Sequence, residues 1–180
     1  MKQIYLVTGN KNKLREWQQM MPADVSLSSA DIDLMEMQSS DVEEVAADKA
    51  RRAFKELGKP VVVEDVSVEL AKLHGLPGPF VRFFLKAMGD DALYALTRGD
   101  EPRAVVACAV AYFDGEHLFT VRGEVPGRIV PPRGENGFGF DATFMPDGYD
   151  TTYAEMSAED KNTVSHRRRA IELFIKAVQE

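Results

Sequence analysis

The sequence is poor in cysteine, in positive charge and in long apolar runs. Its one cysteine, Cys108, excludes an internal disulfide, and the apolar run 105–110 around it indicates an unreactive core thiol. No stretch approaches the roughly 18 apolar residues that cross a membrane. With 22 Lys and Arg against 29 Asp and Glu, the formal net charge is −7. This balance excludes broad binding to nucleic acids or to acidic membranes, both of which need a basic surface.

The first residues run directly into a strand pattern, without an apolar leader segment. We therefore expect a cytoplasmic protein. A chain of 180 residues, 44% hydrophobic and 28% charged, has the composition of a globular protein and can bury one good core. We expect residues 1–180 to form a single domain.

Strand and helix patterns alternate along the chain, which is typical of an α/β fold. Two runs about Asp114-Gly115 predict a hairpin, so part of the sheet is antiparallel. The predicted strands are 3–7, 25–32, 60–63, 103–113, 117–123 and 127–130, and the predicted helices are 13–20, 41–57, 81–88, 91–98 and 167–178. The predicted core residues of the first and last helices are Leu14, Trp17 and Met21, and Ala170, Leu173, Phe174 and Ala177.

Two adjacent carboxylates follow the most apolar predicted strand. Val61, Val62 and Val63 indicate a strand buried on both faces, and Glu64 and Asp65 come directly after it. Ligands of open α/β sheets bind outside the carboxyl ends of the strands. Neighbouring carboxylates repel each other unless a cation or a shared proton intervenes, which is the chemistry of a Mg²⁺ site. A strand that simply ends in solvated acidic residues is the alternative.

A tight turn, Thr8-Gly9-Asn10, joins the first strand to the first helix. Backbone N–H groups at such a helix start, together with the helix dipole, stabilise anions. Lys11 and Lys13 add positive charge at the same place. The turn is neither a Walker A loop nor a G-x-G-x-x-G fingerprint. It indicates either an anion-binding turn of another kind or a tight turn with solvated lysines.

A glycine-rich loop, 131–141, ends in Phe138-Gly139-Phe140-Asp141. Aromatic rings separated by glycines can form a surface on which a nucleobase stacks. Core aromatics beside a turn explain the same pattern equally well.

Cations gather near the start of the last helix. Ser157 indicates a helix start of the capping-box type, and Ser165 is placed to cap the following helix. Lys161, His166 and Arg167 lie near these starts, where positive charge opposes the helix dipole. Such a local conflict is typical of a functional site.

Taken in order, these stretches resemble the inosine triphosphate pyrophosphatase family, which hydrolyses ITP, dITP and XTP to the monophosphate and pyrophosphate. The set runs from residue 8 to residue 167, and its order makes it specific. Phe140 departs from the pattern of the family's eukaryotic members, which often have tryptophan at this position. The matching stretches are Thr8-Gly9-Asn10-x-x-Lys13, Val63-Glu64-Asp65, Gly75-Leu76-Pro77-Gly78-Pro79, Gly127-Arg128-Ile129-Val130, Phe138-Gly139-Phe140-Asp141, Phe144-x-Pro146-Asp147-Gly148-Tyr149, Tyr153-Ala154-Glu155-Met156 and Lys161-Asn162-x-x-Ser165-His166-Arg167.

The resemblance implies an elongated central mixed β-sheet flanked by helices, with two lobes around a substrate cleft, and usually a homodimer. It also implies a Mg²⁺ ion bound by Glu36 and Asp65, and a purine nucleoside triphosphate as substrate. The substrate-binding residues that it implies are Thr8, Gly9, Asn10, Lys11, Lys13, Lys49, Asp65, Val66, Arg82, Phe138, Gly139, Phe140, Asp141, Lys161, Ser165, His166 and Arg167.

In the expected reaction, Mg²⁺ bridges phosphate oxygens while water attacks the α-phosphorus and pyrophosphate leaves. Asp65 is the first candidate for the general base; Glu64 either takes that role or is structural, and Lys13 completes the predicted catalytic set. Arg167 and His166 would donate hydrogen bonds to the 6-keto oxygen of hypoxanthine or xanthine, where adenine has a donor. The alternatives are a pyrophosphatase for other modified nucleotides and a nucleotide-binding protein without activity.

Overall fold

The computed structural model describes residues 3–23, 25–97 and 102–179, and within them the chain forms two compact units. Unit 1 contains residues 1–65, 108–123 and 168–180, and unit 2 contains residues 66–107 and 124–167. Three long strands and the last helix contribute residues to both units. Each unit is described by itself below.

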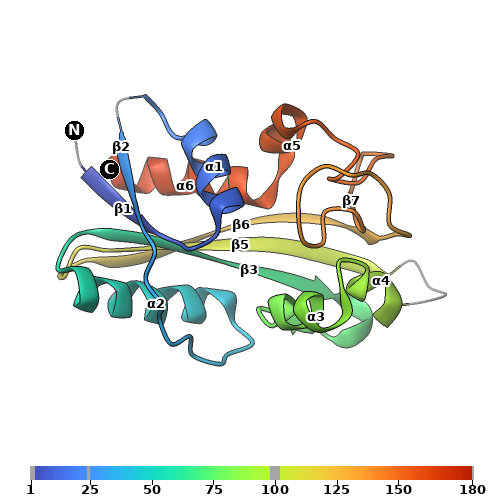
Figure 1. The fold of residues 1–180 in the computed structure, drawn as a ribbon, viewed down its shortest axis with the longest axis horizontal. Helices are drawn as coiled ribbons and strands as arrows, with labels where there is room; N and C mark the ends of the chain where they lie inside the picture. Colours follow the sequence, from blue (N-terminus) through green and yellow to red (C-terminus); the bar gives the residue numbers. More distant parts are fainter. Residues whose placement is uncertain (1–2, 24, 98–101, 180) are drawn as a thin grey trace. The chain divides into compact units, whose positions relative to one another are not determined.

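The strands form one mixed sheet in the order β2-β1-β3-β5-β6-β7, with β4 paired to β3 (Figure 1). β1 is parallel to both of its neighbours, β2 and β3. β4 is antiparallel to β3, and β7 is antiparallel to β6. This confirms the predicted α/β fold with a central mixed sheet flanked by helices. The strand bounds are β1 Gln3–Val7, β2 Ser26–Ala30, β3 Val61–Leu70, β4 Pro77–Gly78, β5 Arg103–Phe113, β6 Leu118–Ile129 and β7 Phe144–Pro146.

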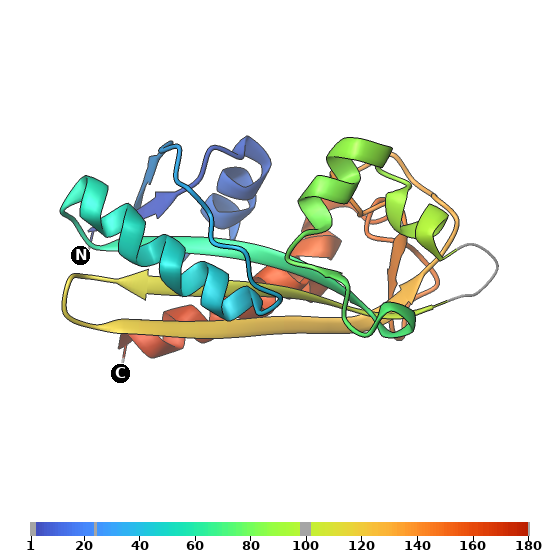
Figure 2. The same ribbon diagram turned by 90° about the horizontal axis from the view of Figure 1, so that it is seen from below.

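Unit 1 packs helices on both faces of its part of the sheet (Figures 1 and 2). The alanine-rich face of α2, Val42–Leu57, shares an apolar cluster with Val61 and Val63 of β3. Small side chains let this helix lie close to the strands. On the opposite face are α1, Lys11–Met20, and α6, His166–Gln179, which meet where the Trp17 and Phe174 ring centroids lie 5.8 Å apart.

Unit 2 has its own core, built on the second halves of the long strands. Val68 and Leu70 of β3, Val106 of β5 and Ile129 of β6 are buried with Phe144 in one apolar cluster. This cluster is covered by short helices and ordered loops. The helices are η1 Ala71–Leu73, α3 Val81–Met88, α4 Ala92–Leu96 and α5 Ala158–Val164.

The prediction that Glu64 and Asp65 end a strand is wrong, because β3 continues to Leu70. After Asp65, the apolar residues Val66, Val68 and Leu70 alternate with polar ones, which is itself a strand pattern. The two carboxylates nevertheless lie just beyond the residues that pair with β1, since the last such pair is Leu6 with Val62.

Other boundaries and core positions also differ from the predictions. The strand predicted at 127–130 is the end of the single long strand β6. Met20 is buried in place of Met21, and Leu173 is 45% exposed, because the buried stripe of α6 is Ala170, Ile171 and Phe174. The helix predicted at 91–98 is observed as Ala92–Leu96 with Thr97 as its C-cap, and the predicted stop at 99–100 lies outside the described residues. Among the helices in the described ranges, none is long and apolar enough to span a membrane.

Candidate functional site

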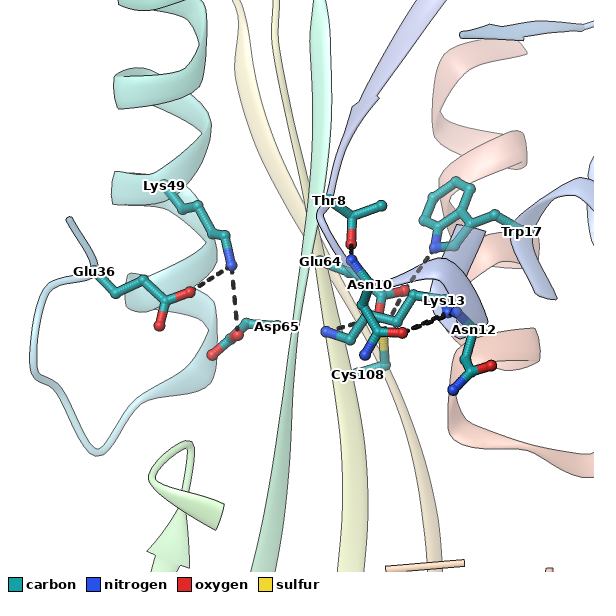
Figure 3. Close-up of polar contacts among 10 residues, drawn as sticks. All are labelled: Thr8, Asn10, Asn12, Lys13, Trp17, Glu36, Lys49, Glu64, Asp65 and Cys108. Carbon is teal, nitrogen blue, oxygen red and sulfur yellow. Dashed lines mark hydrogen bonds and ion pairs between the residues drawn. The ribbon is translucent and has the colours of Figure 1, made fainter. Parts of the chain in front are cut away.

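One lysine contacts two carboxylates in unit 1 (Figure 3). Lys49 on α2 places its Nζ 2.7 Å from Glu36 Oε1 and 3.9 Å from Asp65 Oδ1. Glu36 comes from the irregular segment between β2 and α2, and Asp65 comes from β3. We call Glu36, Lys49 and Asp65 the acid–lysine cluster. Nothing in the helical pattern around Lys49 distinguished it from a solvated lysine.

Burial dominates the electrostatics of Asp65, whose side chain is 16% exposed. Desolvation raises the pKa of Asp65 above its ordinary value, although Lys13 and Lys49 oppose the shift. The neighbouring carboxylates Glu36 and Glu64 raise the pKa further. A carboxyl group with a raised pKa binds a proton more strongly than a solvated one, which suits a general base.

We expect Asp65→Asn to increase the free energy of unfolding at neutral pH in the absence of divalent metal. Because the folded pKa of Asp65 lies above the unfolded one, its stabilising contribution is complete below the unfolded pKa, about 4, and is lost as the pH rises through the folded pKa. Asparagine carries no such pH-dependent cost. Urea unfolding between pH 7.5 and 4.5 should show an advantage of the variant that shrinks as the pH falls. A variant that is less stable than the wild type at pH 7.5 would contradict this.

Glu64 lies on the opposite face of β3, because successive side chains of a strand alternate. It is 2% exposed, and Lys13 Nζ lies 3.1 Å from its Oε1. Trp17 Nε1 donates a hydrogen bond of 2.6 Å to Oε2. The two adjacent carboxylates therefore form ion pairs with different lysines, Glu64 with Lys13 and Asp65 with Lys49, as Figure 3 shows, although the charge of Lys13 also lowers the pKa of Asp65.

The turn before α1 uses its own side chains to satisfy backbone donors. The Asn10 side chain caps the helix by accepting hydrogen bonds from the N–H groups of Asn12 and Lys13, at 2.9 and 3.2 Å. Thr8 Oγ1 accepts from the Asn10 N–H at 3.1 Å. Gly9 lies close to Asp31, and a Cβ atom at this position would lie 2.5 Å from Asp31 Oδ1, so the exposed Asp31 side chain would have to move. Three amides expected to face an anion are therefore hydrogen-bonded within the chain.

The donor set around Lys49 suits a hard divalent cation that is completed by substrate. Mg²⁺ in phosphate-transfer sites typically uses one or two protein carboxylates together with phosphate oxygens and water. Glu36 and Asp65 supply two carboxylates about one centre of positive charge. Within residues 3–23, 25–97 and 102–179, no group of three or more His, Cys, Asp or Glu residues forms a cage made of protein ligands alone.

Unit 2 gathers a second set of predicted residues. Lys161 is 4% exposed and its Nζ lies 2.6 Å from Asp141 Oδ2, which also accepts the Phe138 N–H at 2.8 Å. The Phe138 ring centroid lies 4.9 Å from Lys161 Nζ and 5.8 Å from Arg167 Cζ. His166 lies against Phe140 and Tyr153. We call Phe138, Asp141, Lys161, His166 and Arg167 the aromatic–cation cluster.

The two phenylalanines of the glycine-rich loop have different environments. Phe140 is buried in the apolar core of unit 2, whereas Phe138 is half-buried and lies beside the cations. The core explanation therefore applies to Phe140, and the stacking explanation remains a prediction for Phe138. Gly139 approaches α3, since a Cβ atom there would lie 3.5 Å from Leu85.

The other predicted residues occupy simple positions in unit 2. Val66 is half-buried on β3 next to Asp65. Ser165 is buried at the C-terminal cap of α5, where its N–H donates to the Lys161 carbonyl at 2.9 Å. Arg82 is exposed on α3, with its Cζ 5.5 Å from the Phe83 ring centroid. The Tyr153 ring centroid lies 5.7 Å from Lys161 Nζ. Tyr153 entered the sequence-based predictions only as part of a family motif and was not predicted as a site residue.

The fold and these clusters define an α/β protein whose lysines and carboxylates suit a phosphorylated ligand. The chain belongs to the Ham1 family, whose model matches residues 4–177. It is 44% identical over 173 residues to an inosine triphosphate pyrophosphatase of Yarrowia lipolytica, which covers 94% of this chain and 92% of that protein. It is 38% identical to a dITP/XTP pyrophosphatase of Methanopyrus kandleri, and the match covers 95% of this chain and 93% of that protein. The structure matches that of the Staphylococcus aureus Ham1 protein with a TM-score of 0.84 at 30% identity, and the match covers 99% of this chain and 98% of that one. The resemblance drawn from the sequence motifs is confirmed.

Proposed function

We propose that this protein hydrolyses deaminated purine nucleoside triphosphates, ITP, dITP and XTP, to the monophosphate and pyrophosphate. Its relatives carry names for this activity at 38% and 44% identity over nearly their full lengths. The observation that carries the proposal is the acid–lysine cluster, in which Lys49 contacts both Glu36 and Asp65. Two carboxylates and a lysine are the groups that a metal-bound triphosphate needs.

In unit 1, positive charge for the phosphates comes from lysine side chains. Lys49 belongs to the acid–lysine cluster, and Lys11 and Lys13 lie in the first turn of α1, a turn without acidic residues. Cations at a helix start oppose the helix dipole, so their presence there supports a role toward an anionic ligand. The backbone amides already bonded to Thr8 and Asn10 would serve mainly to fix the turn.

Glu36 and Asp65 would hold the Mg²⁺ ion, which neutralises phosphate charge when bound. Asp65 accepts a proton from the attacking water as the water oxygen bonds to the α-phosphorus. The bond from the α-phosphorus to the bridging oxygen breaks, and pyrophosphate leaves. Glu64 is buried on the other face of β3 and is engaged by Trp17 and Lys13, which supports a structural role for it.

In unit 2, the aromatic–cation cluster would bind a purine base. Phe138 offers a ring face for stacking, and Arg167 and His166 offer donors to the 6-keto oxygen. We also propose the homodimer and the cytoplasmic location that the family resemblance suggests.

A substrate panel tests this proposal. Pyrophosphate release from ITP, dITP, XTP, GTP, ATP and modified pyrimidine triphosphates should be measured at steady state with Mg²⁺ and with a chelator. We expect the three deaminated purines to have the highest kcat/KM, and the chelator to abolish turnover. Higher kcat/KM for a modified pyrimidine would identify a pyrophosphatase of another specificity. Tight binding of ITP without pyrophosphate release would identify a binding protein.

A further inference from the structure

The buried network around Glu64 contains a residue that no motif of the family resemblance includes. Trp17 is the chain's one tryptophan, and it is fully buried on α1. Its indole Nε1 donates to Glu64 Oε2 at 2.6 Å, while Lys13 Nζ lies 3.1 Å from the other oxygen, Oε1. The Cys108 Sγ lies 3.9 Å from Oε2 (Figure 3).

The geometry follows from spacing on one helix. Lys13 and Trp17 are four residues apart on α1, so both side chains lie on the same face of the helix and reach the same carboxylate. The lysine side chain is 19% exposed, whereas the indole is buried, so the ammonium group is on the side of the network nearer the solvent. Glu64 thus connects a core residue to a partly exposed cation.

A carboxylate with one oxygen bonded to a rigid indole cannot rotate freely. The Trp17 ring is held by Phe174, whose ring centroid lies 5.8 Å away in an edge-on arrangement. Its N–H direction is therefore fixed by the core. With Oε2 held in this way, Oε1 presents one defined position to the lysine ammonium.

We propose that Trp17 is a positioning residue for the phosphate-binding turn, and that it acts through Glu64 on Lys13. This role rests on the proposed function, because Lys13 is the group that would contact the triphosphate. Without the indole N–H, the second carboxylate oxygen can turn toward the ammonium and draw it inward. Lys13 would then bind phosphate less well, while the groups around Asp65 on the other face of β3 stay in place.

Trp17→Phe tests the hydrogen bond, because it removes the donor and keeps an aromatic ring. Phe119→Leu is the matched control, since the Phe119 ring stacks on Phe174 at 6.1 Å between centroids, and its loss disturbs the same aromatic packing but leaves the Trp17–Phe174 contact and the indole N–H. We expect Trp17→Phe to weaken pyrophosphate binding, measured by calorimetry, about tenfold, the scale of one hydrogen bond to a charged group. KM for ITP should rise by a similar factor with kcat within about twofold, whereas Phe119→Leu should keep its affinity and lose only stability.

The emission of the single tryptophan gives a readout that does not depend on turnover. We expect saturating pyrophosphate to change Trp17 fluorescence in the wild type and to leave it unchanged in Lys13→Met. A full emission change in Lys13→Met, or pyrophosphate affinity within about twofold of wild type in Trp17→Phe, would overturn the positioning role. Failure of the wild type itself to bind pyrophosphate or hydrolyse ITP would overturn the proposed function, and this role with it.

Discussion

Replacing Asp65 with asparagine is expected to reduce kcat for ITP hydrolysis by about 10²- to 10⁴-fold, the range associated with loss of a general base. The amide keeps the shape of the side chain, but it neither accepts a proton from water nor contributes charge to a bound cation. Burial raises the pKa of this carboxyl group, and Lys49 Nζ lies 3.9 Å from it. The raised pKa and the contact with Lys49 are the reasons for proposing Asp65 as the general base.

Asp48→Asn provides the matched control for this experiment. Asp48 lies on α2 next to Lys49, and its partner is Arg52 rather than a member of the acid–lysine cluster. Pyrophosphate release should be normal in this variant, and circular dichroism should show that both variants are folded. Near-normal turnover in Asp65→Asn would remove Asp65 from the mechanism. Glu64→Gln should then be assayed, because Glu64 is the other carboxylate proposed as base.

The second large effect is expected on substrate selectivity. Arg167→Met should lower kcat/KM for ITP and reduce its preference over ATP by roughly five- to a hundredfold, since a buried donor without an acceptor costs about 1–3 kcal/mol. Arg167 is 2% exposed, and its Cζ lies 5.8 Å from the Phe138 ring centroid. Methionine retains much of the buried stem but none of the guanidinium donors.

Two further variants separate selectivity from stability. Arg167→Lys keeps a charge without the planar fork of donors, so its ITP to ATP ratio should fall between wild type and Arg167→Met. Arg169→Met changes an exposed arginine on the same helix and should leave the ratio unchanged. Both substrates should be assayed with each variant, alongside its melting temperature. An unchanged ratio in a folded Arg167→Met protein would show that the base is recognised elsewhere.

Local pattern was sufficient for much of the fold. The helical spacing of Val42, Val45, Ala46, Ala50 and Ala53 predicted α2 and its buried face, and all five are buried. The Asp114-Gly115 pair predicted the hairpin, where the Asp114 N–H bonds to the His117 carbonyl and Gly115 has a φ of 104°. These features depend on residues close in sequence, which is why the sequence reveals them.

Prediction failed where a residue's environment is set by distant segments. Leu173 fitted a helical stripe but is exposed, because the side chains packed against α6, such as Trp17 and Tyr112, select Phe174 as the contact. Phe138 and Phe140 have the same local pattern, yet only Phe140 joins the core. Lys49 looked like any lysine on a helix until the segment carrying Glu36 was placed beside it.

The sequence by itself determined the family, through ordered motifs, and determined most strands and helices, through hydrophobic periodicity. Only the tertiary structure decided what the adjacent acids Glu64 and Asp65 each contact. Their side chains leave β3 on opposite faces. Glu64 contacts Trp17 of α1, 47 residues earlier in the sequence, and Asp65 contacts Lys49 of α2. Alternation along a strand separates neighbours in sequence, so Glu64 is buried beside Trp17 and Lys13, whereas Asp65 stays partly exposed beside Lys49.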